Sequence, residues 1–354
     1  MFAADSKVAT APVGDETRSA VVNSWKQIID PVEPFLEAVN RRLVQQVETF
    51  DPELVPYADY ALNGQGKHLR PALVALAASA LGKPRDSHIT VAVIIEMVHL
   101  ATLVHDDVMD EAEIRRGQPT LASKWGNDIA VLFGDCLFAQ ALTLAASFPT
   151  PDICRAVAMA TNTVCTGEIL QTQRRKDLRF TREEYFRILE MKTAELFALS
   201  CDLSARLSNA TSAQREALRS FGMNFGTAYQ VYDDCLDLFG SEVTAGKSLG
   251  TDLAKGKLTL PMLLLWDLAD ATERDLIRRL VDNWQPSELT RISGLLDKYK
   301  TLPLSLGIMH QYLEEARQDL HRLPASDGRD RLVGLTGFLS LQTEALGASA
   351  AASL

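Results

Sequence analysis

The most informative stretch of the sequence is Glu96–Thr120, EMVHLATLVHDDVMDEAEIRRGQPT. Apolar residues at helical spacing precede Asp106, which predicts a largely buried helix that ends at an acidic group. On such a helix Asp106, Asp107 and Asp110 share one face, because residues three and four apart are neighbours. Clustered carboxylates repel one another unless a cation lies between them, and hard divalent ions such as Mg²⁺ prefer oxygen ligands. A solvated acidic helix end is the alternative, and this stretch alone leaves both interpretations open.

A second acidic cluster repeats the same spacing further along the chain. The segment Ala228–Asp237, AYQVYDDCLD, carries Asp233, Asp234 and Asp237 after an apolar helical run. Two such clusters predict carboxylates that face each other across a cavity. Chance recurrence of so short a pattern is possible, but recurrence in the same helical context favours a functional pair.

Basic residues lie near both acidic clusters. They occur in three segments, as the pairs Arg115 and Arg116, Lys247 and Lys257, and Lys67 and Arg70. The first pair precedes a Gly–Pro break, and the second lies in a glycine-rich stretch whose backbone can approach a ligand closely. The third pair lies where a helix begins, and free backbone N–H groups there favour anions. Each residue alone is usually a solvated surface charge. Together the acidic and basic groups predict a site for two phosphorylated groups, one bound through metal.

Composition limits the function classes. The chain has 354 residues, of which 47% are hydrophobic and 23% charged, as in an ordinary globular protein. Its net charge of −10 disfavours binding to nucleic acid. No charge-free apolar run reaches the roughly 18 residues of a membrane span, and the N-terminus does not resemble a secretory signal. With five widely spaced cysteines that favour reduced thiols, the sequence predicts a cytoplasmic protein.

Hydrophobic periodicity predicts an all-α fold. Apolar residues recur at helical spacing through eight segments: 21–47, 73–81, 89–109, 129–146, 153–171, 183–207, 214–237 and 258–268. Sustained period-2 alternation is missing, so little β structure is expected. No Pro/Gly/Ser-rich linker divides the middle of the chain. The sequence therefore predicts one domain over residues 19–345, between flexible tails at 1–18 and 346–354.

The motifs, taken in chain order, resemble those of the trans-isoprenyl diphosphate synthases, the polyprenyl synthetase family. They read GxxKxxRP, HDDxxD followed by RRG, KT, YQxxDDxLD and GKxxxxDxxxGKxTLP, and the resemblance extends from about Trp25 to beyond Pro261. It implies a single-domain bundle of about ten core helices around a deep central cavity, normally a homodimer. The implied reaction is the Mg²⁺-dependent head-to-tail condensation of isopentenyl diphosphate with an allylic diphosphate.

The resemblance also implies a role for individual residues. It assigns Mg²⁺ to six aspartates: Asp106, Asp107, Asp110, Asp233, Asp234 and Asp237. It assigns the allylic diphosphate to Arg115, Lys192, Thr193, Gln230, Lys247 and Lys257. It assigns isopentenyl diphosphate to Lys67, Arg70, His99 and Arg116. The residues expected to be catalytic are Asp106, Asp107, Asp110, Lys192, Asp233 and Lys247.

Some positions depart from the family pattern or receive no role. His68 occupies a position where the family commonly has Arg, and Tyr229 occupies one where Phe usually precedes the Gln. These departures leave the reaction class unchanged and affect only the expected substrate affinity. Helical spacing also places Glu168 and Gln171 on one face near the cavity, without an assigned function.

The residues before the first aspartates predict a long product. A growing chain that follows this helix towards its N-terminus gains one isoprene unit per turn of roughly 5.4 Å. Ala101 and Thr102 are small, and Val98 and Ile94 follow on the next turns, so these residues predict a product of C30–C45. The alternative for the two small residues is that they only pack a tight helix crossing. A neighbouring helix could close the pocket instead, with Phe138 or Leu142 as its floor.

Three other functions are less favoured. A shorter-chain synthase making C15–C20 products shares every motif, and only product length separates it. A non-catalytic subunit of a heteromeric synthase usually has eroded aspartate motifs, whereas both are complete here. A terpene cyclase does not bind isopentenyl diphosphate and has no reason to keep Lys67 and Arg70.

Overall fold

The computed structural model describes residues 25–63, 68–240 and 249–352. Two residues predicted to bind diphosphate, Lys67 and Lys247, lie outside this part of the chain, as does the predicted N-terminal tail. The described residues are almost entirely helical, so the all-α prediction is confirmed. Their one hairpin is the antiparallel pair β1 (Ile114–Arg115) and β2 (Gln118–Pro119).

The helices of the N-terminal half are η1 (Asp30–Val32), α2 (Glu33–Val47), α3 (Val55–Asn63), α4 (Leu69–Leu81), α5 (Asp86–Met109), α6 (Leu121–Trp125), α7 (Asn127–Ala146) and α8 (Asp152–Gln173). Those of the middle are α9 (Arg182–Leu189), η2 (Glu190–Ala194), α10 (Glu195–Leu207), α11 (Ser212–Phe239) and α13 (Thr251–Ala254). The C-terminal part has α14 (Leu260–Leu268), α15 (Ala271–Asp282), η3 (Pro286–Glu288), α16 (Leu289–Lys298), α17 (Thr301–Leu320) and α18 (Asp327–Ala352).

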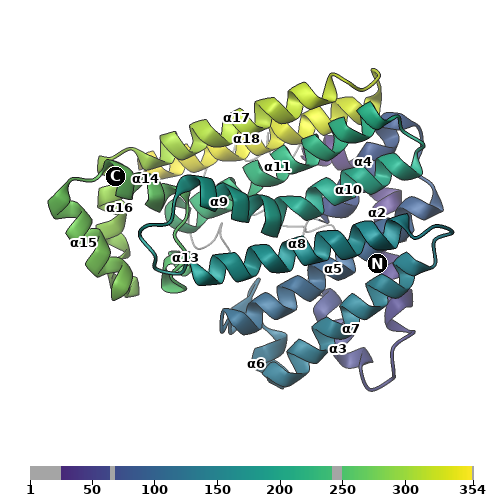
Figure 1. Ribbon diagram of the computed structural model, residues 1–354, viewed down its shortest axis with the longest axis horizontal. Coiled ribbons are helices and arrows are strands. Elements are labelled where there is room, and N and C mark those ends of the chain that lie inside the picture. Colours follow the sequence, from purple (N-terminus) through teal and green to yellow (C-terminus); the bar gives the residue numbers. More distant parts are fainter. Residues whose placement is uncertain (1–24, 64–67, 241–248, 353–354) are drawn as a thin grey trace.

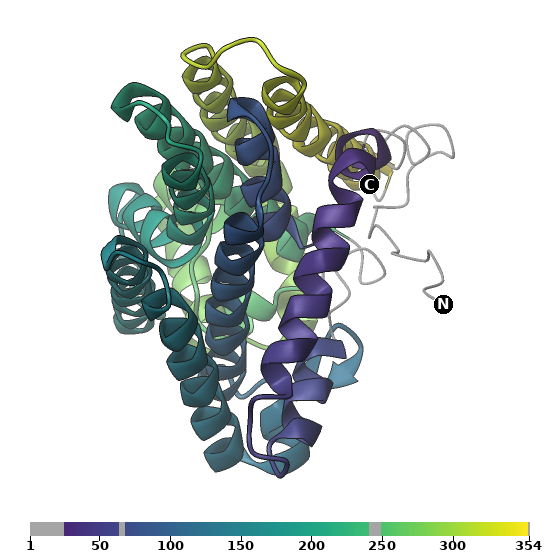
Figure 2. The ribbon, with the colours of Figure 1, turned by 90° about the vertical axis from the view of Figure 1, so that its right-hand side faces the viewer.

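The long helices run side by side and form a bundle (Figure 1). Within it α11 packs against α10 and α17, and α5 packs against α4, α7 and α10. The view along the bundle in Figure 2 shows the N-terminal α2 beside α4 and α5. The short helices α15 and α16 gather with α14 at one end of the molecule (Figure 1). Helices distant in sequence therefore enclose a common interior.

Helix α5 is central because its sequence is apolar on most faces. Val91, Ile94, Ile95 and Ala101 are all fully buried. By length and composition, α5 and α7 are both apolar enough to cross a membrane, with 56% and 33% of the relevant window buried inside the protein. For α5 the packing inside the bundle accounts for this composition. On α7 a larger apolar surface remains exposed.

Three segments differ from the predicted helices. The segment 21–47 is interrupted by the 3₁₀ turn η1, because Pro31 and Pro34 remove backbone donors that a continuous helix needs. The segment 183–207 contains the π-helical turn η2 between α9 and α10. At the C-terminus α18 continues to Ala352, into the segment 346–354 that was predicted to be a tail.

Candidate active site

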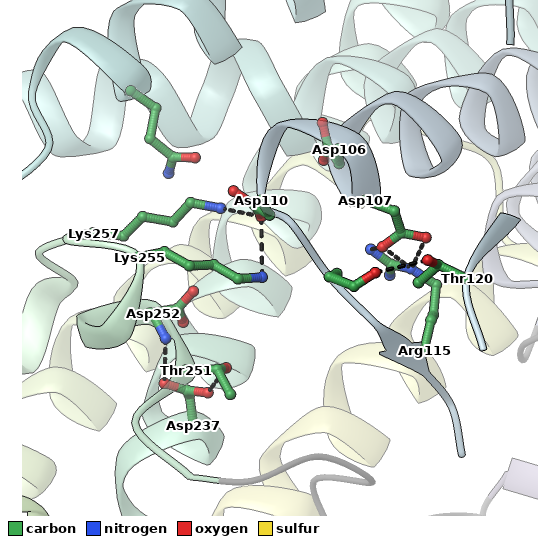
Figure 3. A network of polar contacts seen from close by, with 12 residues as sticks. Asp106, Asp107, Asp110, Arg115, Thr120, Asp237, Thr251, Asp252, Lys255 and Lys257 are labelled. Carbon is green, nitrogen blue, oxygen red and sulfur yellow. Dashed lines mark hydrogen bonds and ion pairs between the residues drawn. The ribbon is translucent and has the colours of Figure 1, made fainter. Parts of the chain in front are cut away.

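The last turn of α5 carries the first aspartate cluster, as predicted. Asp107 is buried and accepts hydrogen bonds from Nε of Arg115 at 2.8 and 3.0 Å, one to each carboxylate oxygen. A third contact, of 2.7 Å, joins Nη2 of Arg115 to the same carboxylate. Arg115 reaches it from β1, because the β1–β2 hairpin folds back beside the end of α5 (Figure 3). The chain reversal at the predicted break uses Arg116 and Gly117, both with positive φ.

Asp110 is surrounded by three cations. Its Oδ1 accepts a hydrogen bond of 2.8 Å from Nη2 of Arg175. Its Oδ2 accepts from Nζ of Lys257 at 2.7 Å and from Nζ of Lys255 at 3.2 Å (Figure 3). Burial alone would raise the pKa of Asp110, but Lys257 and Lys255 lower it to about 2. This carboxylate is therefore ionised at any physiological pH.

Asp106 shares its surroundings with another acid and one lysine. Nζ of Lys192 lies 3.5 Å from Asp106 and pairs with Glu168, while it donates a 2.9 Å hydrogen bond to Gln171. Burial raises the pKa of Asp106, and the charges of Glu168 and Asp110 add to that shift. Burial lowers the pKa of Lys192, but the two carboxylates outweigh it, and the net pKa is raised. One ammonium group thus serves two carboxylates, those of Asp106 and Glu168.

The π turn η2 places Lys192 and Thr193 at the centre of the bundle. A π turn inserts one extra residue into a helix, and such turns often occur at functional sites. The neighbouring helices approach it closely through glycines. A Cβ at Gly167 of α8 would lie 2.8 Å from the backbone N of Lys192, and a Cβ at Gly226 of α11 would lie 2.8 Å from Cα of Ala194. Larger residues at either glycine would displace the turn.

The second aspartate cluster, on α11, is held mainly by uncharged donors. The hydroxyl of Tyr185 donates to Oδ2 of Asp234 at 2.6 Å, and Nε2 of Gln230 donates to Oδ1 at 2.8 Å. Gln230 in turn accepts a 3.0 Å hydrogen bond from Thr193. Burial raises the pKa of Asp234 well above its usual value, and the nearby Asp252 raises it further. This chain of hydrogen bonds connects the π turn directly to the second cluster.

Asp237 is fully buried and anchors the following segment. Its carboxylate accepts a 2.6 Å hydrogen bond from the Thr251 hydroxyl and a 3.1 Å hydrogen bond from the backbone N–H of Asp252 (Figure 3). Its carbonyl accepts from the N–H of Gly250 at 2.8 Å. The carboxylate therefore caps α13 and fixes the residues that lead to Lys257. Asp233, one turn earlier, is half-buried.

A cavity adjoins both clusters. Lys192, Thr193, Gln230 and Asp234 line it together with Gln171, Arg174, Phe180, Tyr185, Ile188, Leu189, Asp252, Lys257, Leu258 and Thr259. Two of these residues also contact the first cluster, since Lys192 lies beside Asp106 and Lys257 bonds Asp110. Asp234 of the second cluster thus borders the cavity, and Lys192 and Lys257 connect it to the first cluster.

A second group of basic residues lies around Glu96. Glu96 is half-buried on α5, with Nδ1 of His68 3.5 Å from its carboxylate. Burial would raise the pKa of Glu96, but His68, His99 and Arg70 lower it to about 2. The Arg70 guanidinium also stacks on the Phe197 ring, 4.6 Å from its centre. Burial and the charge of Arg70 hold the pKa of His99 well below its usual value.

Comparison with known proteins agrees with this geometry. A family model described as polyprenyl synthetase matches residues 51–297. The chain belongs to the polyprenyl synthetase family. It is similar to octaprenyl diphosphate synthase of Haemophilus influenzae, with 32% identity covering 87% of this chain and 94% of that protein. It is also 32% identical to heptaprenyl diphosphate synthase component 2 of Bacillus subtilis, over 92% of this chain and 94% of that protein.

A solved structure supports the same assignment. The polyprenyl synthase of Caulobacter crescentus, in complex with calcium and isoprenyl diphosphate, superposes with a TM-score of 0.85 at 32% identity. The similarity covers 89% of this chain and 97% of that one. As a polyprenyl synthetase the chain is a prenyltransferase, as the motifs predicted.

The predicted chain-length residues of this polyprenyl synthetase lie in the core of the bundle. Ile94, Val98 and Ala101 are buried among apolar neighbours, and Thr102 donates a hydrogen bond to the carbonyl of His99. They are not among the described residues that line the cavity beside the aspartates.

The two candidates for the pocket floor differ in their surroundings. The Phe138 ring packs against His105 of α5, with 5.7 Å between ring centres, whereas Leu142 is 39% exposed.

The structure adds polar residues that sequence reasoning missed or left without a role. Glu168 and Gln171 hold Lys192, Tyr185 holds Asp234, and Glu96 pairs with the basic group. A signal existed for Glu96, which is an isolated acid in the apolar part of α5. Tyr185 had none, because an aromatic residue at helical spacing is usually part of the core.

The donor set of this polyprenyl synthetase fits a hard divalent metal. Among the residues that the structure describes, no three carboxylate, imidazole or thiol groups converge on one point. The carboxylates are instead paired with Arg115, Lys192 and Lys257. Oxygen ligands alone suit Mg²⁺, which keeps several waters and needs only one or two carboxylates. Burial raises the pKa of Asp106, and a bound cation would favour its ionised form.

Proposed function

We propose that this chain condenses isopentenyl diphosphate with an allylic diphosphate and makes a long trans-polyprenyl diphosphate of C30–C45. The observation that carries the proposal is the cavity between the two aspartate clusters, with Lys192 and Lys257 between them. The names of similar proteins, which include octaprenyl and heptaprenyl synthases, support a long product. Ala101 supports the same product class, since it keeps the helix narrow one turn before the aspartates.

The basic residues would stabilise the departing allylic diphosphate. Lys192 and Lys257 line the cavity, and their charges would stabilise the negative charge that develops as the allylic C–O bond breaks. Thr193 and Gln230 would hydrogen-bond the phosphate oxygens. Lys247 is assigned to the same group by the family pattern. The alkene of isopentenyl diphosphate then attacks the allylic cation, and the released diphosphate accepts the proton.

Metal binding belongs to the same proposal. We assign the metal to Asp106, Asp107 and Asp110 on α5 and to Asp233 and Asp234 on α11. When bound, Mg²⁺ would supply positive charge that offsets the charge of the diphosphate. Asp237 has a different role in this proposal, because both its carboxylate and its carbonyl hold the segment before Lys257.

Isopentenyl diphosphate would bind at the basic group around Glu96. Arg70 and His99 lie close enough to lower the pKa of this acid, and Arg116 extends from the hairpin turn. The family pattern adds Lys67. His99 would donate a hydrogen bond to a phosphate oxygen. His68 takes the place of the usual Arg and still pairs with Glu96.

The decisive experiment is a product assay with the purified chain alone. We expect radiolabelled isopentenyl diphosphate to be incorporated with farnesyl or geranylgeranyl diphosphate and Mg²⁺ into products that chromatography places at C30–C45. Products of C15–C20 would support the shorter-chain alternative. Activity that appears only with a second protein would support the heteromeric one. Cyclic hydrocarbons formed without isopentenyl diphosphate would indicate a terpene cyclase.

We also propose that the enzyme is a homodimer through the outer faces of α7 and α8. Apolar side chains are exposed on both helices: Val131, Leu132, Leu142, Met159 and Ile169, from 39% to 65%. Apolar patches of this kind usually mark protein interfaces. Light scattering should give twice the chain mass, and the double change Leu132→Asp and Met159→Asp should give a monomer. A parent protein that stays monomeric, or dimerises only with another chain, would contradict this.

A cytoplasmic location is part of the same proposal. It is supported by the five cysteines, all unpaired.

A further inference from the structure

Three positively charged side chains contact the single negative charge of Asp110. Three cations contact one carboxylate, at 2.8 Å from Arg175, 2.7 Å from Lys257 and 3.2 Å from Lys255. The family pattern accounts for Lys257. It gives no role to Arg175 or Lys255, so their presence requires a separate explanation.

The two additional cations are fixed by contacts between their own segments. Arg175 follows α8, and Lys255 follows α13. The backbone N–H of Lys176 donates a 2.7 Å hydrogen bond to the carbonyl of Gly256. Gly256 has a positive φ, and its side towards Lys176 leaves no space for a Cβ, which would lie 2.8 Å from Cγ of that lysine. The backbone thus brings Arg175 and Lys255 to the same carboxylate from two distant parts of the sequence.

The arrangement leaves donors unused. Among the described residues, no acceptor lies within hydrogen-bond distance of Nε of Arg175, although this atom is buried. A buried donor without a partner costs free energy unless a ligand supplies an acceptor. Guanidinium groups bind phosphate oxygens through two parallel N–H donors, and Nε together with one terminal nitrogen is one pair that can do so. Arg175 therefore has the free donor that a phosphate would use.

We propose that Arg175 and Lys255 bind the allylic diphosphate, and that they leave Asp110 for the phosphate oxygens when a divalent cation takes this carboxylate. The inference rests on the proposed function. In the absence of metal the two side chains neutralise Asp110 and compete with the metal. With substrate present, the same side chains neutralise the diphosphate instead.

This exchange predicts two effects of opposite sign. Removing either side chain removes a competitor for Asp110, so metal alone should bind more tightly. The same change removes a contact to the diphosphate, so an anion should bind more weakly. A residue that only stabilises the fold would weaken both, and a residue that only binds diphosphate would leave metal binding unchanged.

The experiment measures both affinities in Arg175→Gln, Lys255→Gln and the double variant. The first measurement is Mn²⁺ binding without substrate, followed by the electron paramagnetic resonance signal of free Mn²⁺. The second is calorimetric binding of inorganic pyrophosphate at saturating Mg²⁺. Arg179→Gln and Lys83→Gln are matched controls, because Arg179 is exposed in the same loop as Arg175 and Lys83 is exposed elsewhere. Arg175→Lys keeps the positive charge but has a single donor group. It replaces Arg175→Gln in both measurements if the Gln variant folds poorly.

We expect the Kd for Mn²⁺ to fall about threefold to tenfold, and the Kd for pyrophosphate to rise about tenfold for each side chain, as for other hydrogen bonds to charged groups. The controls should match the parent in both. Unchanged pyrophosphate affinity would overturn the binding role, and unchanged or weaker Mn²⁺ binding would overturn the exchange. Failure of the proposed function has a different signature, namely a parent enzyme that makes no polyprenyl product. Neither binding measurement requires turnover.

Discussion

The two aspartate clusters have the same spacing on two long helices, but the groups that hold them differ in kind. On α5, Asp107 and Asp110 bond guanidinium and ammonium groups. On α11, Asp234 bonds a phenol and an amide, and Asp237 bonds a hydroxyl and a backbone N–H. The pKa of Asp110 is lowered to about 2, whereas burial raises that of Asp234 well above its usual value.

The same aspartate motif can therefore be stabilised either by cationic side chains or by neutral hydrogen-bond donors. The α5 cluster is already neutralised by cations, so an arriving metal must compete with them. On α11 the printed partners of Asp234 are neutral, a phenol and an amide, so a cation that arrives there would favour its buried charge. A pattern of aspartates therefore identifies a site without specifying how each carboxylate is stabilised.

The largest effect on kcat is expected when the first carboxylate of either cluster is removed. Asp106→Ala and Asp233→Ala should each lower kcat by a factor on the order of 10³ or more, because both are expected to hold metal where charge develops in the transition state. Steady-state assays with excess Mg²⁺ would test this, and circular dichroism should show an intact helical fold. Asp135→Ala is the control, since this residue is 62% exposed on α7. Near-parental turnover in either site variant would contradict the assignment.

A smaller effect is expected from the neutral donor of the second cluster. Tyr185→Phe removes only the hydroxyl that donates to Asp234, and loss of a partner that orients a metal ligand typically costs about 10–100-fold in metal affinity or activity. The apparent Mg²⁺ constant from kinetics should rise by this factor. Tyr312→Phe is a matched control, because both rings pack against Phe186. Equal behaviour of the two variants would show that the Tyr185 hydroxyl has no such role.

The opposite pKa shifts predict stability changes of opposite sign. The pKa of Asp110 is lowered from 3.8 to about 2, so its ionised form contributes about 2 kcal/mol above pH 3.8, which is lost as the pH falls through 2. Asp110→Asn should therefore lower the free energy of unfolding at pH 7 and flatten its loss in acid. The pKa of Asp234 is raised, so its charge costs stability increasingly as the pH rises above 3.8. Asp234→Asn should raise the free energy of unfolding at pH 7.

Urea denaturation between pH 7 and pH 3 would measure both changes in metal-free buffer. Asp275→Asn is the control, because its side chain is 65% exposed beside Arg278. A change of the same sign in the two site variants would remove the electrostatic distinction between the clusters.

The sequence could predict the clusters but not their environments. Helical periodicity predicts the helices α5 and α11, and the repeated spacing singles out the six aspartates on them. The partners of these aspartates come from distant segments, as Tyr185 reaches Asp234 and Arg175 reaches Asp110. Such contacts depend on packing, and each of these residues has an ordinary alternative role on a helix or loop. The capping role of Asp237 was hidden for the same reason.

The π turn shows a second limit. Residues 183–207 have the periodicity of one continuous helix, because one extra residue scarcely changes the apolar pattern. The turn is visible only with its neighbours, where Gly167 and Gly226 allow α8 and α11 to approach Lys192 and Ala194. The sequence therefore located Lys192 and Thr193 but not the irregularity that presents them.

The smallest effect on turnover is expected from a substitution that changes product length without changing any charge. Only a residue on α5 should have this effect. Ala101 lies five residues before Asp106, and Ala228 lies five residues before Asp233, both fully buried. If the growing chain runs along α5, Ala101→Phe should shorten the product towards C15 while the rate of the first condensation changes by less than about tenfold.

Ala101→Leu is the milder variant, because overpacking a core typically costs about 1–3 kcal/mol. Ala228→Leu should leave product length at the parental value, since α11 would not border the chain. Chromatography of labelled products from the three variants, at matched turnover, would measure this. Unchanged length in both Ala101 variants would mean that Ala101 only packs α5 against its neighbours, and shortening by Ala228→Leu would place the growing chain beside α11.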